Sequence, residues 1–312
     1  MSTKVAFEKW EGLGNDFVLV EADPFDWSDD RVRQVCDRRR GVGADGVLFV
    51  SRGSPMELPR MVVRNADGSR PEMCGNGIRC VAGYLVRHVK KAAGVVTIAT
   101  DAGPKRCDVS VAGNQYEVTV AMGPARPDGR LAVKLNGALH DFMFVNVGNP
   151  HAVTFERYNE AEIDAVGPRV ATHPEGGTNV EFCRIVQSDT LLGETALAPP
   201  QQGHLCNGVH IGAAQAVSDS VHTGVGVHKA AHNTPRIDVV VWERGVGRTL
   251  ACGTGACAVA AAACASGHFS FDTPVRVRLP GGDLIITVEA NSWQATMRGP
   301  ARRVYTGDLE FE

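Results

Sequence analysis

The sequence predicts an α+β fold of two pseudo-symmetric halves, each a β-sheet wrapped around one central helix. The first observation behind this prediction is an internal repeat. Residues 72–88 (EMCGNGIRCVAGYLVRH) and 250–266 (LACGTGACAVAAAACAS) share Cys-Gly-x-Gly followed by an apolar run, 178 positions apart. The second is a set of short runs of alternating β-branched residues around both segments, a pattern typical of strands. We expect the two halves to meet at a cleft.

Each cysteine-led segment is expected to begin a helix. Glycine is a poor helix former and alanine the best, so glycines followed by apolar and alanine-rich residues indicate a tight turn that opens a helix. Cys74 and Cys252 then stand at the first turn of each helix. Cys80 and Cys257 fall half-way along, where a cysteine is most often a buried core residue.

Six runs of alternating β-branched residues are interpreted as strands. They are RMVVRN (60–65), VVTIAT (95–100), QYEVTVAM (115–122), RIDVVVWE (236–243), VRVRLP (275–280) and DLIITVEA (283–290). Because they lie on both sides of the expected helices, each half contributes a sheet.

Other echoes between the halves reveal an insertion. GLGNDF (12–17) precedes NVGNPH (146–151) by 134 positions, as GADGVLF (43–49) precedes GTNVEFC (177–183). The change of offset from 134 to 178 implies about 44 additional residues in the second half. Residues 188–234 are poor in charge and lack a sustained period, so we interpret them as an inserted loop.

These offsets suggest the domain boundaries. The first half, with Cys74, is expected to cover residues 1–121 and to be completed by residues 301–312. The second half, with Cys252, is expected to cover residues 122–300, including the insertion.

Composition limits the partners and the location. The 312 residues carry a formal net charge of -3, which gives no reason to expect nucleic acid or an anionic membrane as a partner. No run of about 18 apolar residues is present, and charges occupy the place where a signal peptide needs an apolar stretch. The nine cysteines are therefore expected to be reduced thiols in a cytoplasmic protein.

A metal site is not predicted. No CxxC pair and no GxxxxGK[ST] motif occur. Five of the ten histidines lie in the insertion at irregular spacing, which disfavours a metal centre. They are His204, His210, His222, His228 and His232.

A cysteine at the start of a helix has access to particular chemistry. Unpaired N–H groups and the positive end of the helix dipole lower the pKa of a thiol, to about 3.5–7.5 in known cases. The same N–H groups bind anions, so a carboxylate could dock on Gly75–Asn76 or Gly253–Thr254. Two sulfurs facing one carbon suit a two-base transfer, in which one removes a proton and the other returns one on the opposite face.

The motifs together resemble the diaminopimelate epimerase family, whose cofactor-independent members interconvert LL- and meso-diaminopimelate. The matching segments are GLGNDF (12–17), GVGADG (41–46), RNADGS (64–69), MCGNGIRC (73–80), NVGNPHAV (146–153), GTNVEF (177–182), WERGVGRTLACGTGACA (242–258) and LPGGDL (279–284). The resemblance spans nearly the whole chain except the insertion, in the order of the family.

This resemblance implies roles for individual residues. It makes Cys74 and Cys252 the two bases. The substrate-contacting asparagines of the family correspond to Asn15, Asn65, Asn149 and Asn179. The carboxylate of the reacting end corresponds to the backbone at Gly75, Asn76, Gly253 and Thr254. The acid–base pair that meets the amino and carboxylate groups of the substrate corresponds to Glu243 and Arg244, and the residues that tune the thiols correspond to His151 and Glu243.

The resemblance also implies the wider setting. It predicts an isomerase of lysine and cell-wall precursor synthesis that uses no cofactor or metal and takes diaminopimelate as its small-molecule substrate. A homodimer is a family-level expectation.

Two alternatives remain open from the sequence. A related amino-acid racemase of the proline or histidine type could use the same fold, although the proline type carries histidine where this chain has Asn76. A redox-responsive binding protein could instead join Cys74 and Cys252 in a disulfide, a change that free-thiol titration would detect.

Overall fold

The structure is a computed structural model that describes residues 3–89, 93–113, 115–135, 137–186 and 235–311. The expected insertion at 188–234, with its five histidines, lies outside these described residues. Within them, no helix is long and apolar enough to cross a membrane.

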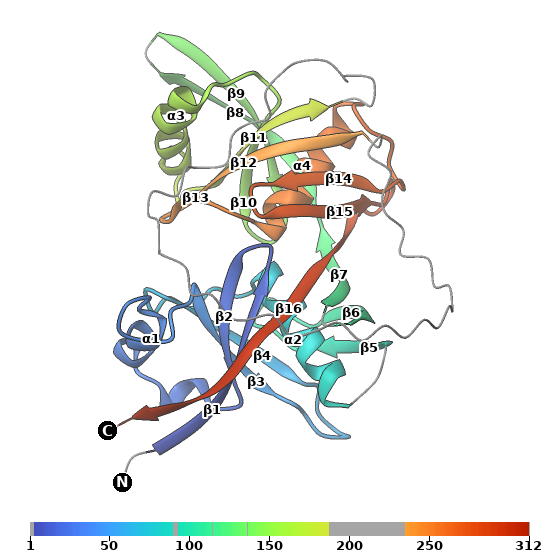
Figure 1. Cartoon of the computed structure of the whole chain (residues 1–312). Helices are drawn as coiled ribbons and strands as arrows, with labels where there is room; N and C mark the ends of the chain where they lie inside the picture. Colours follow the sequence, from blue (N-terminus) through green and yellow to red (C-terminus); the bar gives the residue numbers. More distant parts are fainter. Residues whose placement is uncertain (1–2, 90–92, 114, 136, 187–234, 312) are drawn as a thin grey trace, which may run out of the picture.

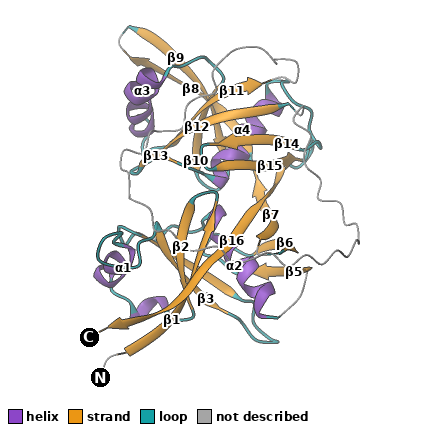
Figure 2. Cartoon of the chain, viewed as in Figure 1, coloured by secondary structure: helices purple, strands orange, loops and turns teal. Residues whose placement is uncertain are grey.

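The predicted architecture is confirmed: two halves, each with one central helix, build a mixed α+β molecule (Figures 1 and 2). The first half contains β1 (Thr3–Gly12), β2 (Asn15–Val20), β3 (Gly46–Ser51), β4 (Arg60–Asn65), β5 (Ala93–Ile98), β6 (Lys105–Ala112) and β7 (Gln115–Pro124). Its helices are α1 (Asp29–Cys36) and the central α2 (Gly75–His88), with a 3-10 turn at Pro24–Asp26.

The second half repeats this plan. Its strands are β8 (Arg126–Leu135), β9 (Ala138–Asn146), β10 (Pro150–Thr154), β11 (Asn179–Val186), β12 (Arg236–Glu243), β13 (Gly247–Thr249), β14 (Val275–Leu279), β15 (Gly282–Val288) and β16 (Gln294–Phe311). Its helices are α3 (Glu160–Thr172) and the central α4 (Gly253–Ala265). All six strands and both helices expected from the sequence are present.

The register of the strands repeats between the halves. In the first, β2 and β3 are parallel and β3 and β4 antiparallel; in the second, β10 and β11 are parallel and β11 and β12 antiparallel. The start of β2 and the residue before β10 contact the first turn of the central helix of their half, through Asn15 to Asn76 and through Asn149 to Thr254. The pairing matches the sequence repeat to within one residue: Phe17 lies opposite Gly46 and His151 opposite Asn179, so β3 and β11 are offset by 133 positions and not by 134.

Two long strands join the halves. β16 pairs with β15 through Ile285–Val288 and later with β1 through Thr3–Glu11, so it passes from the second half into the first (Figure 1). β7 pairs with β6 and also with β16. The boundary expected at residues 121 and 122 falls inside β7, and it stays a prediction.

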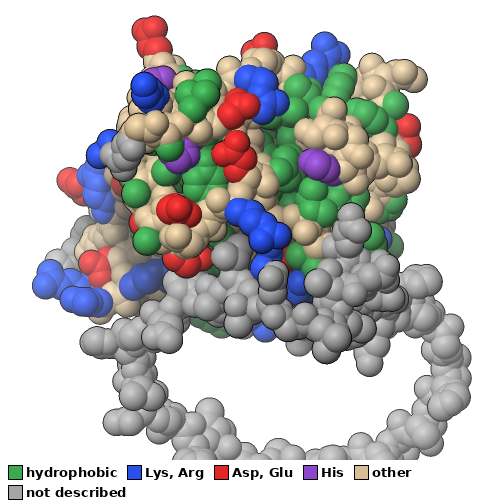
Figure 3. Space-filling model, turned by 90° about the horizontal axis from the view of Figure 1, so that it is seen from above, with side chains coloured by type: hydrophobic (Ala, Val, Ile, Leu, Met, Phe, Trp, Pro, Cys, Tyr) green, Lys and Arg blue, Asp and Glu red, His purple; other side chains and the backbone are tan. Residues whose placement is uncertain are grey.

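The two central helices are buried on nearly all sides. In α4, residues 256–263 have no exposed surface, because small alanine side chains allow the surrounding strands to close around the helix. Cys80 and Cys257 are fully buried in the same core, as the sequence predicted. On the outside, seen from above, acidic and basic side chains are interspersed with apolar ones (Figure 3).

Candidate active site

The two central helices begin in the same way. Cys74 is the N-cap of α2, and its sulfur accepts a hydrogen bond from the Gly77 N–H at 3.4 Å. Cys252 is the N-cap of α4, and its sulfur accepts from the Gly255 N–H, also at 3.4 Å. Each thiol therefore lies against the donor end of a helix.

The two helix starts meet at glycines. A Cβ atom added to Gly75 would lie 3.2 Å from the Cα of Gly253, and the reverse substitution gives the same distance. Met297 of β16 lies against both glycines. The sequence repeat thus brings the two cysteine motifs, 178 positions apart in the chain, to one place at the junction of the halves.

Asn15 and Asn76 connect the first thiol to the other half. Asn76 donates through Nδ2 to Asn15 Oδ1 at 3.1 Å and to the Ala251 carbonyl at 3.1 Å. The Cys74 thiol lies 4.0 Å from the same Asn15 oxygen. Asn15 Nδ2 in turn donates to the Asp45 carboxylate at 2.6 Å.

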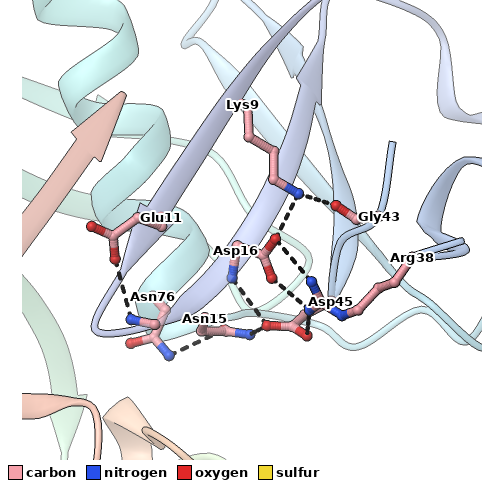
Figure 4. A network of polar contacts seen from close by, with 9 residues as sticks. Lys9, Glu11, Asn15, Asp16, Arg38, Gly43, Asp45 and Asn76 are labelled. Carbon is pink, nitrogen blue, oxygen red and sulfur yellow. Dashed lines mark hydrogen bonds and ion pairs between the residues drawn. The ribbon is translucent and has the colours of Figure 1, made fainter. Parts of the chain in front are cut away.

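A charged network fixes this asparagine (Figure 4). Lys9 lies 2.6 Å from the Asp16 carboxylate, and its ammonium also donates to the Gly43 carbonyl. Arg38 bridges Asp16 and Asp45 at 2.7 and 2.6 Å. Burial opposes the charge on Asp16, but hydrogen bonds from Arg38 and Lys9 outweigh it and lower the pKa of this carboxyl. The network holds Asp45 in place to receive Asn15.

In the second half, a continuous chain of hydrogen bonds ends at Cys252. Its sulfur lies 3.5 Å from the Thr254 hydroxyl, which receives Asn149 Nδ2 at 3.4 Å. Asn149 Oδ1 lies 3.1 Å from His151 Nε2, and His151 Nδ1 lies 2.7 Å from Glu181 Oε1. His151 and Glu181 are both fully buried.

The end of β12 supplies opposite charges beside each other. Glu243 accepts a hydrogen bond from the Thr249 hydroxyl at 2.6 Å. Arg244 donates its backbone N–H to Asn179 Oδ1 at 3.0 Å, and its guanidinium donates to the Gly176 carbonyl. Asn179 opens β11 directly across from His151 on β10. Glu243, Arg244 and Asn179 thus share one edge of the sheet.

Asn65 closes β4 at the corresponding edge of the first half. Its side chain donates to the Ser69 hydroxyl at 2.9 Å, within its own turn, and its backbone pairs with Gly46 of β3. The described contacts join Asn65 to this turn and not to the other asparagines.

The thiol pKa values depart from the direction expected for a helix start. Removal from water raises the pKa of Cys74, although the N–H groups of Gly77 and Asn76 act to lower it. The Glu243 carboxylate raises it further, and the Arg79 guanidinium lowers it. The expectation was wrong because it considered the helix dipole and omitted the burial of the sulfur.

The pKa of the Cys252 thiol is raised as well. Burial raises its pKa well above the usual value, and the carboxylates of Glu243 and Glu181 add to this. Hydrogen bonds from Thr254 and Gly255 act against it. Glu243 itself is half-buried, and its partial removal from water raises the pKa of its carboxyl. The Glu243 carboxylate therefore raises the pKa of both thiols.

Sequence reasoning missed two buried charges, Glu181 and Arg79. Both have no exposed surface. Arg79 donates to the carbonyls of Gly75 and Pro300 and to Asn76 Oδ1, at 3.0, 3.1 and 2.9 Å. A charged residue within an otherwise apolar strand or helix was the available signal. Within the described residues, no group of three His, Cys, Asp or Glu side chains is arranged to hold a metal ion.

Comparison with known proteins agrees with this geometry. The family model for diaminopimelate epimerase matches residues 7–127 and 207–304, which include both cysteine motifs. A diaminopimelate epimerase from Desulforudis audaxviator is 37% identical over 320 residues, with 96% of this chain and 98% of the relative covered. The chain belongs to the diaminopimelate epimerase family.

Other relatives extend this result. A diaminopimelate epimerase from Synechocystis sp. is 33% identical over 329 residues, with 98% of this chain and 99% of the relative covered. Among solved structures, a probable proline racemase from Agrobacterium radiobacter has a TM-score of 0.65 at 14% identity, covering 99% of this chain and 93% of that one. The likeness to the proline racemase shows that the two proteins share a fold. Membership in the diaminopimelate epimerase family identifies this chain as an isomerase.

Proposed function

We propose that this protein interconverts LL- and meso-diaminopimelate, with Cys74 and Cys252 as the two bases. The observation that carries the proposal is the meeting of two equivalent cysteine-capped helix starts at one point. In each direction, a thiolate removes the proton from the α-carbon and becomes a thiol. The thiol on the other side gives its proton to the opposite face and becomes a thiolate, so protons balance and the configuration inverts.

The helix starts would stabilise the intermediate. Removing the α-proton leaves negative charge that spreads onto the neighbouring carboxylate. The backbone N–H groups at Gly75, Asn76, Gly253 and Thr254 suit this carboxylate, since they lie at the positive ends of two helix dipoles. Donors fixed by the fold need no rearrangement as the charge develops.

The remaining polar residues suit an amino acid with two charged ends. We assign Arg244 to a substrate carboxylate and Glu243 to an ammonium group, because each offers the opposite charge. Asn15, Asn65, Asn149 and Asn179 can both donate and accept, so each can meet either kind of group. His151, hydrogen-bonded to Asn149, and Glu243, which acts on both sulfurs, are assigned to tuning the thiols.

Exchange in heavy water tests the proposal. The protein is incubated with LL-diaminopimelate in D₂O, and the loss of the α-proton signal is followed by NMR together with formation of the meso isomer. Cys74→Ala and Cys252→Ala are each expected to abolish epimerisation, whereas Cys36→Ala, which changes a buried thiol of another core region, leaves it intact. Near-full turnover by either active-site variant would refute the two-base assignment.

The substrate is tested in the same assay. L-proline and L-histidine replace diaminopimelate at equal concentration, and we expect exchange with diaminopimelate alone. Faster exchange of either of the other amino acids would assign the chain to a racemase of that type.

We also propose a cytoplasmic homodimer, as the family resemblance implies. The chain has a mass of 33.2 kDa, so light scattering of the purified protein is expected to give about twice this value. A mass equal to one chain at micromolar concentration would contradict it.

A further inference from the structure

The two halves differ at a position that the repeat makes equivalent. A Cβ atom added to Gly77 would lie 2.9 Å from the Leu48 side chain, whereas one added to Gly255 would lie 2.7 Å from Glu181 Oε1. Leu48 pairs with Val63 across β3 and β4, as Glu181 pairs with Val241 across β11 and β12. Beneath the first thiol, therefore, the fold places an apolar side chain, and beneath the second a carboxylate.

The neighbouring strand differs in the same way. Phe17 of β2 lies opposite Gly46 of β3, and His151 of β10 lies opposite Asn179 of β11. An apolar pair in the first half, Phe17 and Leu48, thus corresponds to a polar pair in the second, His151 and Glu181.

The polar pair is costly to bury. Glu181 has no exposed surface, and its Oε2 atom has no hydrogen-bond partner among the described residues. The titratable groups around Glu181 are His151 on β10, Glu243 at the end of β12, Cys252 at the start of α4 and Cys183 on β11. Since an apolar pair fills the equivalent space in the first half, packing alone does not explain the carboxylate.

We propose that Glu181 is a positioning residue that, by holding His151, keeps one proton exchangeable with Cys252. The inference rests on the proposed two-base function. Between the imidazole and the sulfur, Asn149 and Thr254 complete an unbroken chain of hydrogen bonds.

The hydrogen bonds between His151 and Cys252 can run in either of two consistent donor-to-acceptor directions. In one, both nitrogens of His151 carry protons; Nδ1 donates to Glu181 and Nε2 to Asn149 Oδ1, while Asn149 Nδ2 donates to Thr254. The Thr254 hydrogen then points to a Cys252 thiolate. In the other, His151 keeps only its Nδ1 proton, the Asn149 amide is reversed, and the Cys252 thiol donates to Thr254. Both states contain the same number of protons, so one proton resides either on the sulfur or on the imidazole.

The carboxylate makes the first state accessible. A buried imidazolium without a counter-ion is strongly disfavoured, and Glu181 supplies the counter-ion at 2.7 Å. Cys74 has a different surrounding: its sulfur contacts the Gly77 N–H and Asn15 Oδ1. The two thiols are therefore inequivalent, and among the residues that the structure describes only Cys252 is joined to a buried acid–base pair.

A double-mutant cycle tests this coupling. Glu181→Leu and His151→Phe are each expected to lower kcat about 100-fold with KM within about threefold, as expected for loss of an acid–base group. The double variant, which copies the apolar pair of the first half, is expected to lose no more than the worse single variant, because Glu181 acts through His151. It should fold and be at least as stable as the wild type, since no buried charge is left unpaired.

A second readout does not depend on turnover. In a Cys74→Ala background, alkylation of Cys252 by iodoacetamide is followed by peptide mass spectrometry between pH 6 and 8. With Glu181 and His151 present, the thiolate forms by internal transfer, so the rate is expected to change less than about threefold. In the double variant the proton must leave to solvent, so the rate is expected to rise about 100-fold over these two pH units.

Several results would overturn the proposal. These are a wild-type kcat in Glu181→Leu, multiplicative losses in the double variant, or the same alkylation profile with and without the pair. Glu21→Gln, which changes a carboxylate paired with Arg52 in the first half, serves as a control and should leave kcat and the profile unchanged. If wild-type protein fails to epimerise diaminopimelate, the proposed function fails, while the alkylation profiles still decide the role of Glu181.

Discussion

Gly75 and Gly253 touch across the junction of the two halves, where a Cβ atom on either would lie 3.2 Å from the Cα of the other. This distance is tighter than an ordinary contact between a methyl group and backbone, so the helix starts must move apart by a few tenths of an ångström if either residue is alanine. The positions of the two sulfurs depend on this approach.

We therefore expect Gly75→Ala and Gly253→Ala to reduce kcat/KM about tenfold, because a displacement of about 1 Å at a catalytic group can cost about 100-fold and the added Cβ requires a smaller shift. Steady-state kinetics with diaminopimelate measures the effect. Gly94→Ala in β5 is the matched control, since its added Cβ would meet Val86 at an ordinary 3.5 Å. Equal activity of the three variants would show that the glycine contact does not position the thiols.

Arg79 should assist ionisation of Cys74. Its buried guanidinium lowers the pKa of this thiol, so Arg79→Met is expected to move the alkylation profile of Cys74 to higher pH. The measurement uses a Cys252→Ala background and iodoacetamide between pH 6 and 10. Arg87→Met, near the end of α2 and paired with Glu8, should leave the profile in place. A shift to lower pH would contradict the assigned sign.

We expect the charged form of Glu243 to lower the free energy of unfolding. Burial raises the pKa of its carboxyl above 4.5, so the folded protein binds this proton more tightly than the unfolded chain does. Stability from this group is therefore greatest at low pH and is lost as the pH rises through the raised pKa. We expect Glu243→Gln to be more stable than the wild type at pH 7, with the difference vanishing near pH 4. Urea unfolding at both pH values checks this, and a greater difference at pH 4 would reverse the conclusion.

Asp45 should act through Asn15. Asp45→Ala removes the acceptor of Asn15 Nδ2 and of the Asp16 N–H, so the amide next to Cys74 loses its fixed orientation. We expect kcat/KM to fall about tenfold, in line with the roughly 1.5–3 kcal/mol that a hydrogen bond to a charged group contributes. Asp108→Ala, an exposed carboxylate of β6 paired with Arg106, is the control. Unchanged kinetics in Asp45→Ala would show that this charged network does not contribute to catalysis.

The sequence allowed prediction of those features that the repeat duplicates. The cysteine-capped helices, the flanking strands and the fold class follow from motifs that occur twice, because equivalent segments must build equivalent structures. The glycines that bring Cys74 and Cys252 together were singled out for the same reason.

What could not be predicted depends on differences between the halves and on burial. In the aligned repeats GADGVLF and GTNVEFC, Glu181 stands opposite Val47, and this exchange of an apolar residue for a charged one was a signal. Only the strand pairing shows that Leu48 occupies the equivalent place in the structure. The direction of the thiol pKa values needed the surroundings of each sulfur, which no local motif specifies. Asn65 could be assigned by resemblance, but its contacts in the structure stay within its own turn.

The strands β7 and β16 each pair with strands of both halves. Each half finishes with a strand that continues into its neighbour: β16 pairs with β15 and then with β1, while β7 pairs with β6 and with β16. If the chain were cut between residues 121 and 122, each fragment would carry unpaired strand edges, which promote aggregation. Because each half depends on a strand that also pairs with the other half, the two halves and their two thiols form a single folding unit.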